Sequence, residues 1–176
     1  MRLVHTSGDP NIVHDLRFSP GAVEAGLTAL EQSADVLCDI EMVSHGISKR
    51  YLPGQIYCFL NAPTVAERAR QTGETRAMAA MAEWPAYLAG SIVVIGNAPT
   101  ALFRLLELLD EGAPWPALII GMPVGFINAA ESKQALWDIA PTEFQTPCIT
   151  LLGRRGGSSL AAATLNALTR MVGGVR

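Results

Sequence analysis

The stretch Ile92-Val-Val-Ile-Gly-Asn-Ala-Pro-Thr100 has a close parallel in Ala117-Leu-Ile-Ile-Gly-Met-Pro-Val-Gly125. Each is a short apolar run that ends at a glycine and is followed by a proline. An unbroken run of this kind is typical of a strand buried on both faces, which indicates a parallel sheet. Because ligands of open α/β sheets bind beyond the carboxyl ends of the strands, the turns 96–100 and 121–125 are the first candidates for a binding site.

Strands and helices alternate along the rest of the chain. Apolar runs predict five strands, at residues 35–39, 55–60, 91–95, 117–120 and 148–152. Capping residues and helical periodicity predict helices at residues 20–31, 63–71, 74–88, 99–109, 128–137 and 158–169, with a disturbance at Pro85. The polar segment 44–54 is long enough for a binding loop. The predicted fold is a three-layer, doubly wound α/β fold with a mainly parallel five-stranded sheet and helices on both faces.

Length and composition indicate one globular domain over residues 1–176. The chain is 49% hydrophobic and 16% charged, which suits a sizeable core. Its formal net charge of -3 argues against a general nucleic-acid binder, because phosphate contacts need a concentrated basic surface. The first residues lack the apolar core of a signal peptide, and no apolar run approaches the roughly 20 residues of a membrane span. We therefore expect a soluble, cytoplasmic protein with no membrane partner.

The cysteines and carboxylates do not suggest a metal centre. Cys38, Cys58 and Cys148 are far apart and lie in apolar runs, which is typical of reduced core residues. Asp39 and Glu41 are interpreted as polar residues at the end of a strand rather than as ligands. Neither a metal nor another cofactor is predicted.

A third glycine-rich turn carries two arginines. Residues 152–159, Leu-Gly-Arg-Arg-Gly-Gly-Ser-Ser, join a predicted strand to the amino end of a predicted helix. Free backbone N–H groups and the helix dipole favour an anion there, so the turn is a candidate carboxylate or phosphate cradle. A tight turn with solvated arginines explains the same residues equally well. The turn lacks the Gly-Lys-Ser or Gly-Lys-Thr of a phosphate-binding loop, which leaves nucleotide binding weakly supported.

Three histidines are the candidates for acid–base chemistry, since imidazole is the usual proton donor near neutral pH. His14 is interpreted as structural. His45 could face the site or satisfy a turn carbonyl, and the second interpretation is favoured. His5 lies among small polar residues that could orient its ring, although an ordinary terminal histidine would look the same. No Gly-x-Ser-x-Gly elbow and no Cys–His pairing in sequence indicates a hydrolase.

Taken together, seven short motifs resemble the precorrin-8X methylmutase family of cobalamin biosynthesis, in order and over nearly the whole chain. They lie at residues 4–9, 39–47, 73–77, 96–102, 121–126, 130–133 and 154–158. The resemblance implies migration of a methyl group from C11 to C12 of a corrin precursor, giving hydrogenobyrinate or the cobalt-containing cobyrinate. It assigns the proton donor to His5 and a substrate-carboxylate contact to Arg76, a task that suits a bidentate guanidinium. An ion pair of Arg76 with Glu74 or Glu83 is the structural alternative.

The corrin precursor implied by the resemblance is a large flat ring with many carboxylates, so its pocket should combine apolar walls with scattered donors. The turns and motifs supply both, with Phe126 as a further wall and Lys49 and Arg50 as further donors. The predicted substrate-binding residues are Met42, Gly46, Ser48, Thr75, Arg76, Asn97, Pro99, Thr100, Met122, Pro123, Val124, Gly125 and Arg154.

The resemblance also implies a homodimer, for which residues 105–109 or 161–168 are candidate contacts. It further implies about forty residues ahead of the Val-His motif, whereas here His5 is close to a chain end, where order is commonly poor. An acid must be held within hydrogen-bond reach of its acceptor. A non-catalytic or weakly active tetrapyrrole-binding homologue is therefore the alternative to an active methylmutase, and a nucleotide-binding module is a third hypothesis.

Overall fold

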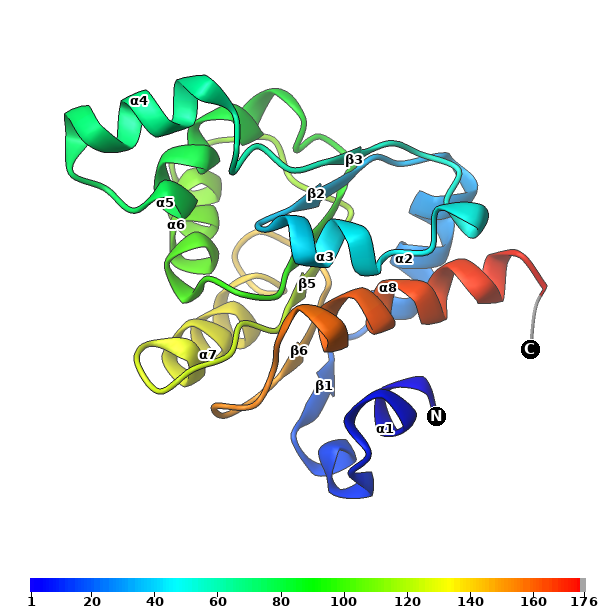
Figure 1. The fold of residues 1–176 in the computed structure, drawn as a ribbon. Helices are drawn as coiled ribbons and strands as arrows, with labels where there is room; N and C mark the ends of the chain where they lie inside the picture. The colour runs from blue at the N-terminus through cyan, green and yellow to red at the C-terminus, as the bar shows by residue number, and fades with distance from the viewer. Residues whose placement is uncertain (175–176) are drawn as a thin grey trace.

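The computed structural model describes residues 1–174 and forms an α/β fold around one mixed sheet (Figure 1). The strand order is β1-β6-β5-β4-β2-β3. All neighbouring strands are parallel except β1, which pairs antiparallel with β6. The strands are β1 (Leu16–Phe18), β2 (Val36–Cys38), β3 (Ile56–Tyr57), β4 (Ile92–Ile95), β5 (Leu118–Gly121) and β6 (Cys148–Leu151).

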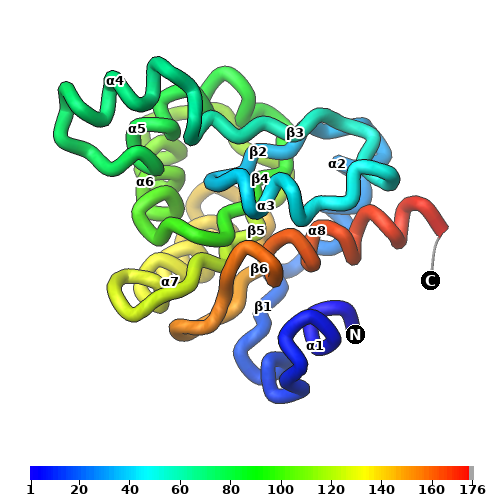
Figure 2. The backbone as a smooth tube through the Cα atoms, in the orientation of Figure 1, coloured from blue at the N-terminus to red at the C-terminus, as the bar shows by residue number. Residues whose placement is uncertain are grey.

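Two helical layers cover the sheet, as predicted (Figure 2). Each layer packs on its own apolar core. One layer contains α1 (Arg2–Ser7), α2 (Ala22–Glu31), α3 (Glu41–Gly46) and α8 (Ser158–Val172), and α1 packs along α8. The opposite layer contains α5 (Arg76–Ala80), η3 (Met81–Ala86), α6 (Pro99–Asp110) and α7 (Ala129–Ile139), with α4 (Pro63–Thr72) packed on α5. The short helices η1 (Pro10–His14) and η2 (Lys49–Tyr51) complete the described chain.

The two apolar runs that predicted a parallel sheet form its centre. All four residues of β4 and all four of β5 are buried. Ile92 and Val94 belong to the core under α2 and α8, whereas Val93 and Ile95 belong to the core under α6. Burial on both faces explains why these strands read as continuous apolar runs rather than as alternating ones.

The sheet has six strands, so the predicted count of five was wrong. The missing strand is β1, whose three residues are too few to produce a period-two pattern. Pairing with β6 stabilises it, through the register Leu16 with Leu151. The predicted strand 55–60 is shorter than expected, because β3 is an edge strand that pairs with β2 at only two positions.

Short helical segments account for the remaining differences. The segment 44–54, predicted as a binding loop, contains the end of α3 and the η2 turn. The predicted helix 74–88 is divided into α5 and η3, and Pro85 lies inside η3, where it cannot donate the backbone hydrogen bond of a regular helix. The six-residue helix α1 was also missed. Among the described residues, no helix has both the length and the apolar character needed to cross a membrane.

Candidate active site

A buried carboxylate shapes the turn after β4. Asp39, directly after β2, is 5% exposed, and its Oδ1 accepts a hydrogen bond from the Gly96 N–H at 3.0 Å. Its Oδ2 accepts from the N–H groups of Asn97 at 2.9 Å and Ala98 at 2.8 Å. Three backbone donors therefore converge on one side chain, which fixes the entry of the chain into α6. Pro99 follows in the first turn of that helix, where a missing N–H costs nothing.

The charge state of Asp39 reflects two opposing effects. Burial raises the pKa of this carboxyl, and the hydrogen bonds from the three backbone N–H groups oppose that rise. From sequence, Asp39 is interpreted as an ordinary polar residue at the end of a strand, and this interpretation misses its role in the turn. Its position offered a signal, because a carboxylate immediately after a fully buried strand lies beside the carboxyl end of the neighbouring strand.

The three glycine-containing turns meet at the carboxyl edge of the sheet, as the strand pattern predicted. Gly96 approaches the start of α8 so closely that a Cβ there would lie 2.8 Å from the Cα of Ser158. The Gly157 N–H donates to the Met122 carbonyl at 2.8 Å. Gly156 has no room for a side chain, since its Cβ would lie 2.4 Å from the same carbonyl. The turn after β6 is therefore pressed against the turn after β5.

This edge presents both apolar side chains and a cation. Met42 is 67% exposed and Phe126 is 86% exposed, and Val124 is exposed as well. The Arg154 guanidinium lies 5.6 Å from the centre of the Phe126 ring, within the range of a cation–π contact. Asn97 is exposed, and Pro99, Thr100 and Gly125 are partly exposed.

Two predicted wall residues have a different environment. Met122 and Pro123 are buried, and the Met122 sulfur lies 3.5 Å from the Thr164 hydroxyl, which donates toward it. Both therefore pack inside the molecule in this structure. A substrate contact by either side chain stays a prediction.

The segment that contains Gly46 and Ser48 is tied to α8 by one amide. The Ser48 N–H donates to Oδ1 of Asn166 at 2.8 Å, and Nδ2 of Asn166 donates to the Gly46 carbonyl at 2.8 Å. Gly46 also lies against Ala162, because a Cβ on this glycine would be 2.9 Å from the Ala162 Cβ. Sequence reasoning missed Asn166, which is 118 residues from Ser48 and carries no local signal.

Arg76 lies at the β3 end of the sheet. Its guanidinium donates to the Leu60 carbonyl and to Oδ1 of Asn61, each at 3.0 Å. These contacts differ from the ion pair with Glu74 or Glu83 that was the structural alternative. Thr75 caps α5, because its Oγ1 accepts from the Met78 N–H at 3.2 Å. Both side chains are exposed.

His5 lies on the opposite layer from Arg76. It is an exposed residue of α1, beside a depression of about 570 Å³ that is lined by Met1, Arg2, Val4, His5 and Arg170. Arg2 and Arg170 were not predicted, because nothing in the sequence indicates that residues so far apart meet. In Figure 1, α1 and α5 lie on opposite sides of the molecule, so one chain does not bring His5 and Arg76 to a common centre.

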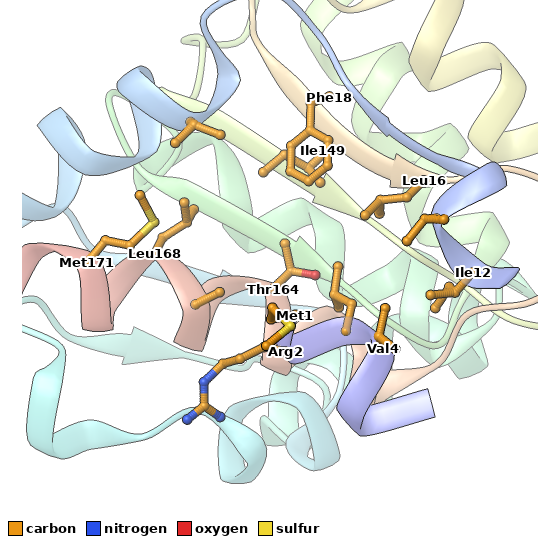
Figure 3. A pocket seen from close by; sticks show the side chains of 14 residues that line it. Met1, Arg2, Val4, Ile12, Leu16, Phe18, Ile149, Thr164, Leu168 and Met171 are labelled. Atoms are coloured by element: carbon orange, nitrogen blue, oxygen red, sulfur yellow. The ribbon is translucent and has the colours of Figure 1, made fainter. Parts of the chain in front are cut away.

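An apolar cavity of about 260 Å³ adjoins this depression (Figure 3). It lies between α1 and α8 and shares Met1, Arg2 and Val4 with the depression that contains His5. Figure 3 shows Leu168 and Met171 of α8 lining the same cavity. His5 is thus close to an apolar surface on one side and to two arginines on the other.

The other two histidines lie elsewhere. His14 is exposed in η1, and its carbonyl accepts a hydrogen bond from Arg17 at 2.8 Å. His45 is exposed on α3, with Nε2 3.9 Å from Oε2 of Glu41 rather than against a turn carbonyl. Within residues 1–174, no group of three or more His, Cys, Asp or Glu side chains is arranged to hold a metal ion.

The sequence matches one protein family over nearly its whole length. The family model described as precorrin-8X methylmutase matches residues 1–171. A precorrin-8X methylmutase from Pseudomonas aeruginosa is 51% identical over 96% of this chain and 80% of its own length. A cobalt-precorrin-8 methylmutase from Priestia megaterium is 38% identical over 96% of this chain and 74% of its own length.

The fold agrees with a solved structure of the same family. A crystal structure of precorrin-8X methylmutase from Thermus thermophilus superimposes with a TM-score of 0.87 at 39% identity, over 98% of this chain and 84% of that one. The match therefore includes the sheet, both helical layers and the turns at the carboxyl edge. On both sequence and structure, this chain belongs to the precorrin-8X methylmutase family.

Proposed function

We propose that this chain is a methylmutase that moves the C11 methyl group of precorrin-8X, or of cobalt-precorrin-8, to C12. The observation that carries the proposal is the family match over residues 1–171, with relatives of both names. A methylmutase is an isomerase, so the product keeps every atom of the substrate. A tetrapyrrole carrier without activity is less well supported, because the matched relatives carry methylmutase names.

In the proposed mechanism, His5 delivers the proton that the conjugated ring needs before the methyl group migrates. The methyl group moves with its bonding electron pair, so no covalent nucleophile is required. Because the reaction is an isomerisation, a proton given to the ring is balanced by one that the ring loses. The exposure of His5 beside a depression leaves its ring accessible to a large flat substrate.

Arginines are proposed to bind the substrate carboxylates. Arg2 and Arg170 line the depression beside His5, and Arg154 lies at the carboxyl edge of the sheet. A guanidinium binds a carboxylate through two parallel hydrogen bonds, which orients the ring as well as holding it. Thr75, Thr100 and the exposed turn residues near Asn97 are proposed as further contacts.

A homodimer with a shared site is the proposed assembly. His5 and Arg76 both lie in family motifs, yet they occupy opposite layers of one chain. If both contact one ring, they come from two copies of the chain. In the contact stretches suggested by sequence, residues 105–109 and 161–168, Leu105, Leu109, Ala161 and Leu168 are buried within the single chain, so the proposal does not rest on these side chains.

The activity is tested by incubating the purified protein with precorrin-8X and following the visible spectrum of the ring. Wild-type protein should convert the substrate, and His5→Ala should bind it without conversion. His14→Ala is the matched control, since it removes an exposed histidine outside the proposed site and should keep full activity. Tight binding without conversion by the wild type would favour the carrier instead.

The shared site is tested by mixing two inactive variants. If each site takes His5 from one chain and Arg76 from the other, random exchange of subunits between His5→Ala and Arg76→Ala should restore roughly a quarter of the wild-type activity, through hybrid dimers with one intact site. A mixture that stays inactive although mass measurements show hybrid dimers would contradict the shared site.

A further inference from the structure

Lys133 is buried without a carboxylate partner in direct contact. Its side chain, on α7, has an exposed fraction of 0%, although lysine is seldom fully buried. The ammonium Nζ donates a hydrogen bond to the carbonyl of Arg155 at 2.5 Å. Through this hydrogen bond Lys133 holds the backbone of the turn after β6. The mechanism proposed above for the methyl migration does not use Lys133.

The side chain of Arg155 links this turn to the amino-terminal segment. Its two terminal nitrogens donate to Oδ2 of Asp9 at 2.5 Å and to Oδ2 of Asp15 at 2.6 Å. Asp9 begins η1, where its Oδ1 accepts from the Asn11 N–H at 2.8 Å, and Asp15 ends it. One guanidinium therefore fastens both ends of the turn that follows α1.

The helix that carries His5 is short and is held by its packing on α8 and η1. α1 has six residues, only Leu3 of these is buried, and within the described chain no side chain caps its start. A helix this short is not stable by itself, so tertiary contacts decide where it lies. Hydrogen bonds between Ser7 and Asp9 join α1 to η1, and the ion pair of Asp9 with Arg155 links this segment to the turn after β6.

We propose that Arg155 and Lys133 are positioning residues, which together fix the helix of His5 relative to the turn that carries Arg154. The inference rests on the proposed function of His5 as the proton donor. Arg154 and Arg155 are neighbours with different tasks, because Arg154 lies over the exposed Phe126 ring, whereas Arg155 is engaged by two carboxylates of this chain. Lys133 anchors the backbone from which both arginines project.

The two adjacent arginines provide a matched experiment with two measurements. Arg155→Ala should lower kcat about tenfold or more with KM within about twofold, because a displaced acid loses proton transfer rather than binding. Amide hydrogen exchange of residues 2–7 should accelerate in this variant. Arg154→Ala should instead raise KM severalfold and leave the exchange of residues 2–7 at the wild-type rate.

Conservative variants separate positioning from folding. Arg155→Lys should recover part of the lost kcat, because an ammonium still reaches one carboxylate but not both. Asp9→Asn keeps an Oδ1 that can cap η1 but replaces the oxygen that accepts from Arg155 with an amide NH2, so it removes this contact and should lower kcat in the same direction even if Arg155→Ala does not fold. Lys133→Met should also accelerate the exchange of residues 2–7.

The outcomes distinguish the inference from the proposed function. Wild-type kcat and exchange rates in Arg155→Ala, or an effect on KM alone, would overturn the positioning role. If the wild-type protein lacks methylmutase activity, the proposed function fails, while the exchange of residues 2–7 in Arg155→Ala still decides whether the bridge holds α1.

Discussion

The turns after β4 and after β6 are fastened by buried side chains of opposite charge. At the β4 turn, the carboxylate of Asp39 accepts three backbone N–H groups. At the β6 turn, the ammonium of Lys133 donates to one backbone carbonyl. Each turn thus receives the charge that its inward-facing backbone groups require, since a buried polar group without a partner is costly.

The two turns differ in how many hydrogen bonds offset the cost of burying the charged side chain. Asp39 has three hydrogen bonds that favour its ionised form, against the burial that raises its pKa. Burial lowers the pKa of Lys133 to about 8, and nearby Asp15 opposes this shift only in part. At mildly alkaline pH Lys133 becomes neutral in the folded chain. A neutral amine can still donate to the Arg155 carbonyl, so the β6 turn can keep its hydrogen bond while the cost of the buried charge is removed.

The largest effect is expected from Asp39→Ala, which breaks the stronger of the two fastenings. Three backbone N–H groups lose their acceptor, and we expect the free energy of unfolding to fall by about 3 kcal/mol or more. Urea denaturation followed by circular dichroism measures this change. Asp110→Ala, which removes an exposed carboxylate at the end of α6, should stay within about 0.5 kcal/mol of wild type.

An effect of intermediate size on the free energy of unfolding is expected from Lys133→Met, and its size depends on pH. Between pH 8 and pH 10 the unfolded chain keeps the lysine proton that the folded chain releases, so this group makes stability rise with pH, by about 2 kcal/mol in total. Lys133→Met should lack this component. Urea midpoints of both proteins at pH 7, 8, 9 and 10 give the comparison, and parallel pH profiles would contradict the lowered pKa.

The smallest effect is expected from Asn166→Ala, which tests a turn held by a neutral amide. The loss of two hydrogen bonds, to Gly46 and Ser48, should lower the free energy of unfolding by about 1 kcal/mol. Asn166→Asp sharpens the comparison, because it keeps the acceptor for Ser48 and removes the donor for Gly46. A loss as large as that in Asp39→Ala would mean that charge is not what separates these fastenings.

Sequence predicted the centre of the fold because its signals are local. β4, β5 and α6 follow from two apolar runs and from Pro99, and each is present. β1 and α1 were missed because they are short and are stabilised by β6 and α8, elements at the other end of the chain. Their partners cannot be identified from the spacing of neighbouring residues.

At the candidate site, the meeting of the turns was predicted from sequence, but the buried charges were not. The turns at 96–100 and 121–125 meet the turn after β6, as parallel strands require. The buried charges of Asp39 and Lys133 were missed, since a charged residue looks the same in sequence whether it meets water or a backbone group. Arg2 and Arg170 flank the depression that contains His5 only because α1 returns to α8.

The pairing of β1 with β6 determines when the amino-terminal segment can fold during synthesis. Residues 2–18 leave the ribosome well before β6 and α8, the strand and helix against which they pack. Domains acquire their long-range contacts only when both partners have emerged. The helix with His5 can therefore reach its native position only after β6 and α8 have been made, so the proposed acid is positioned late in folding.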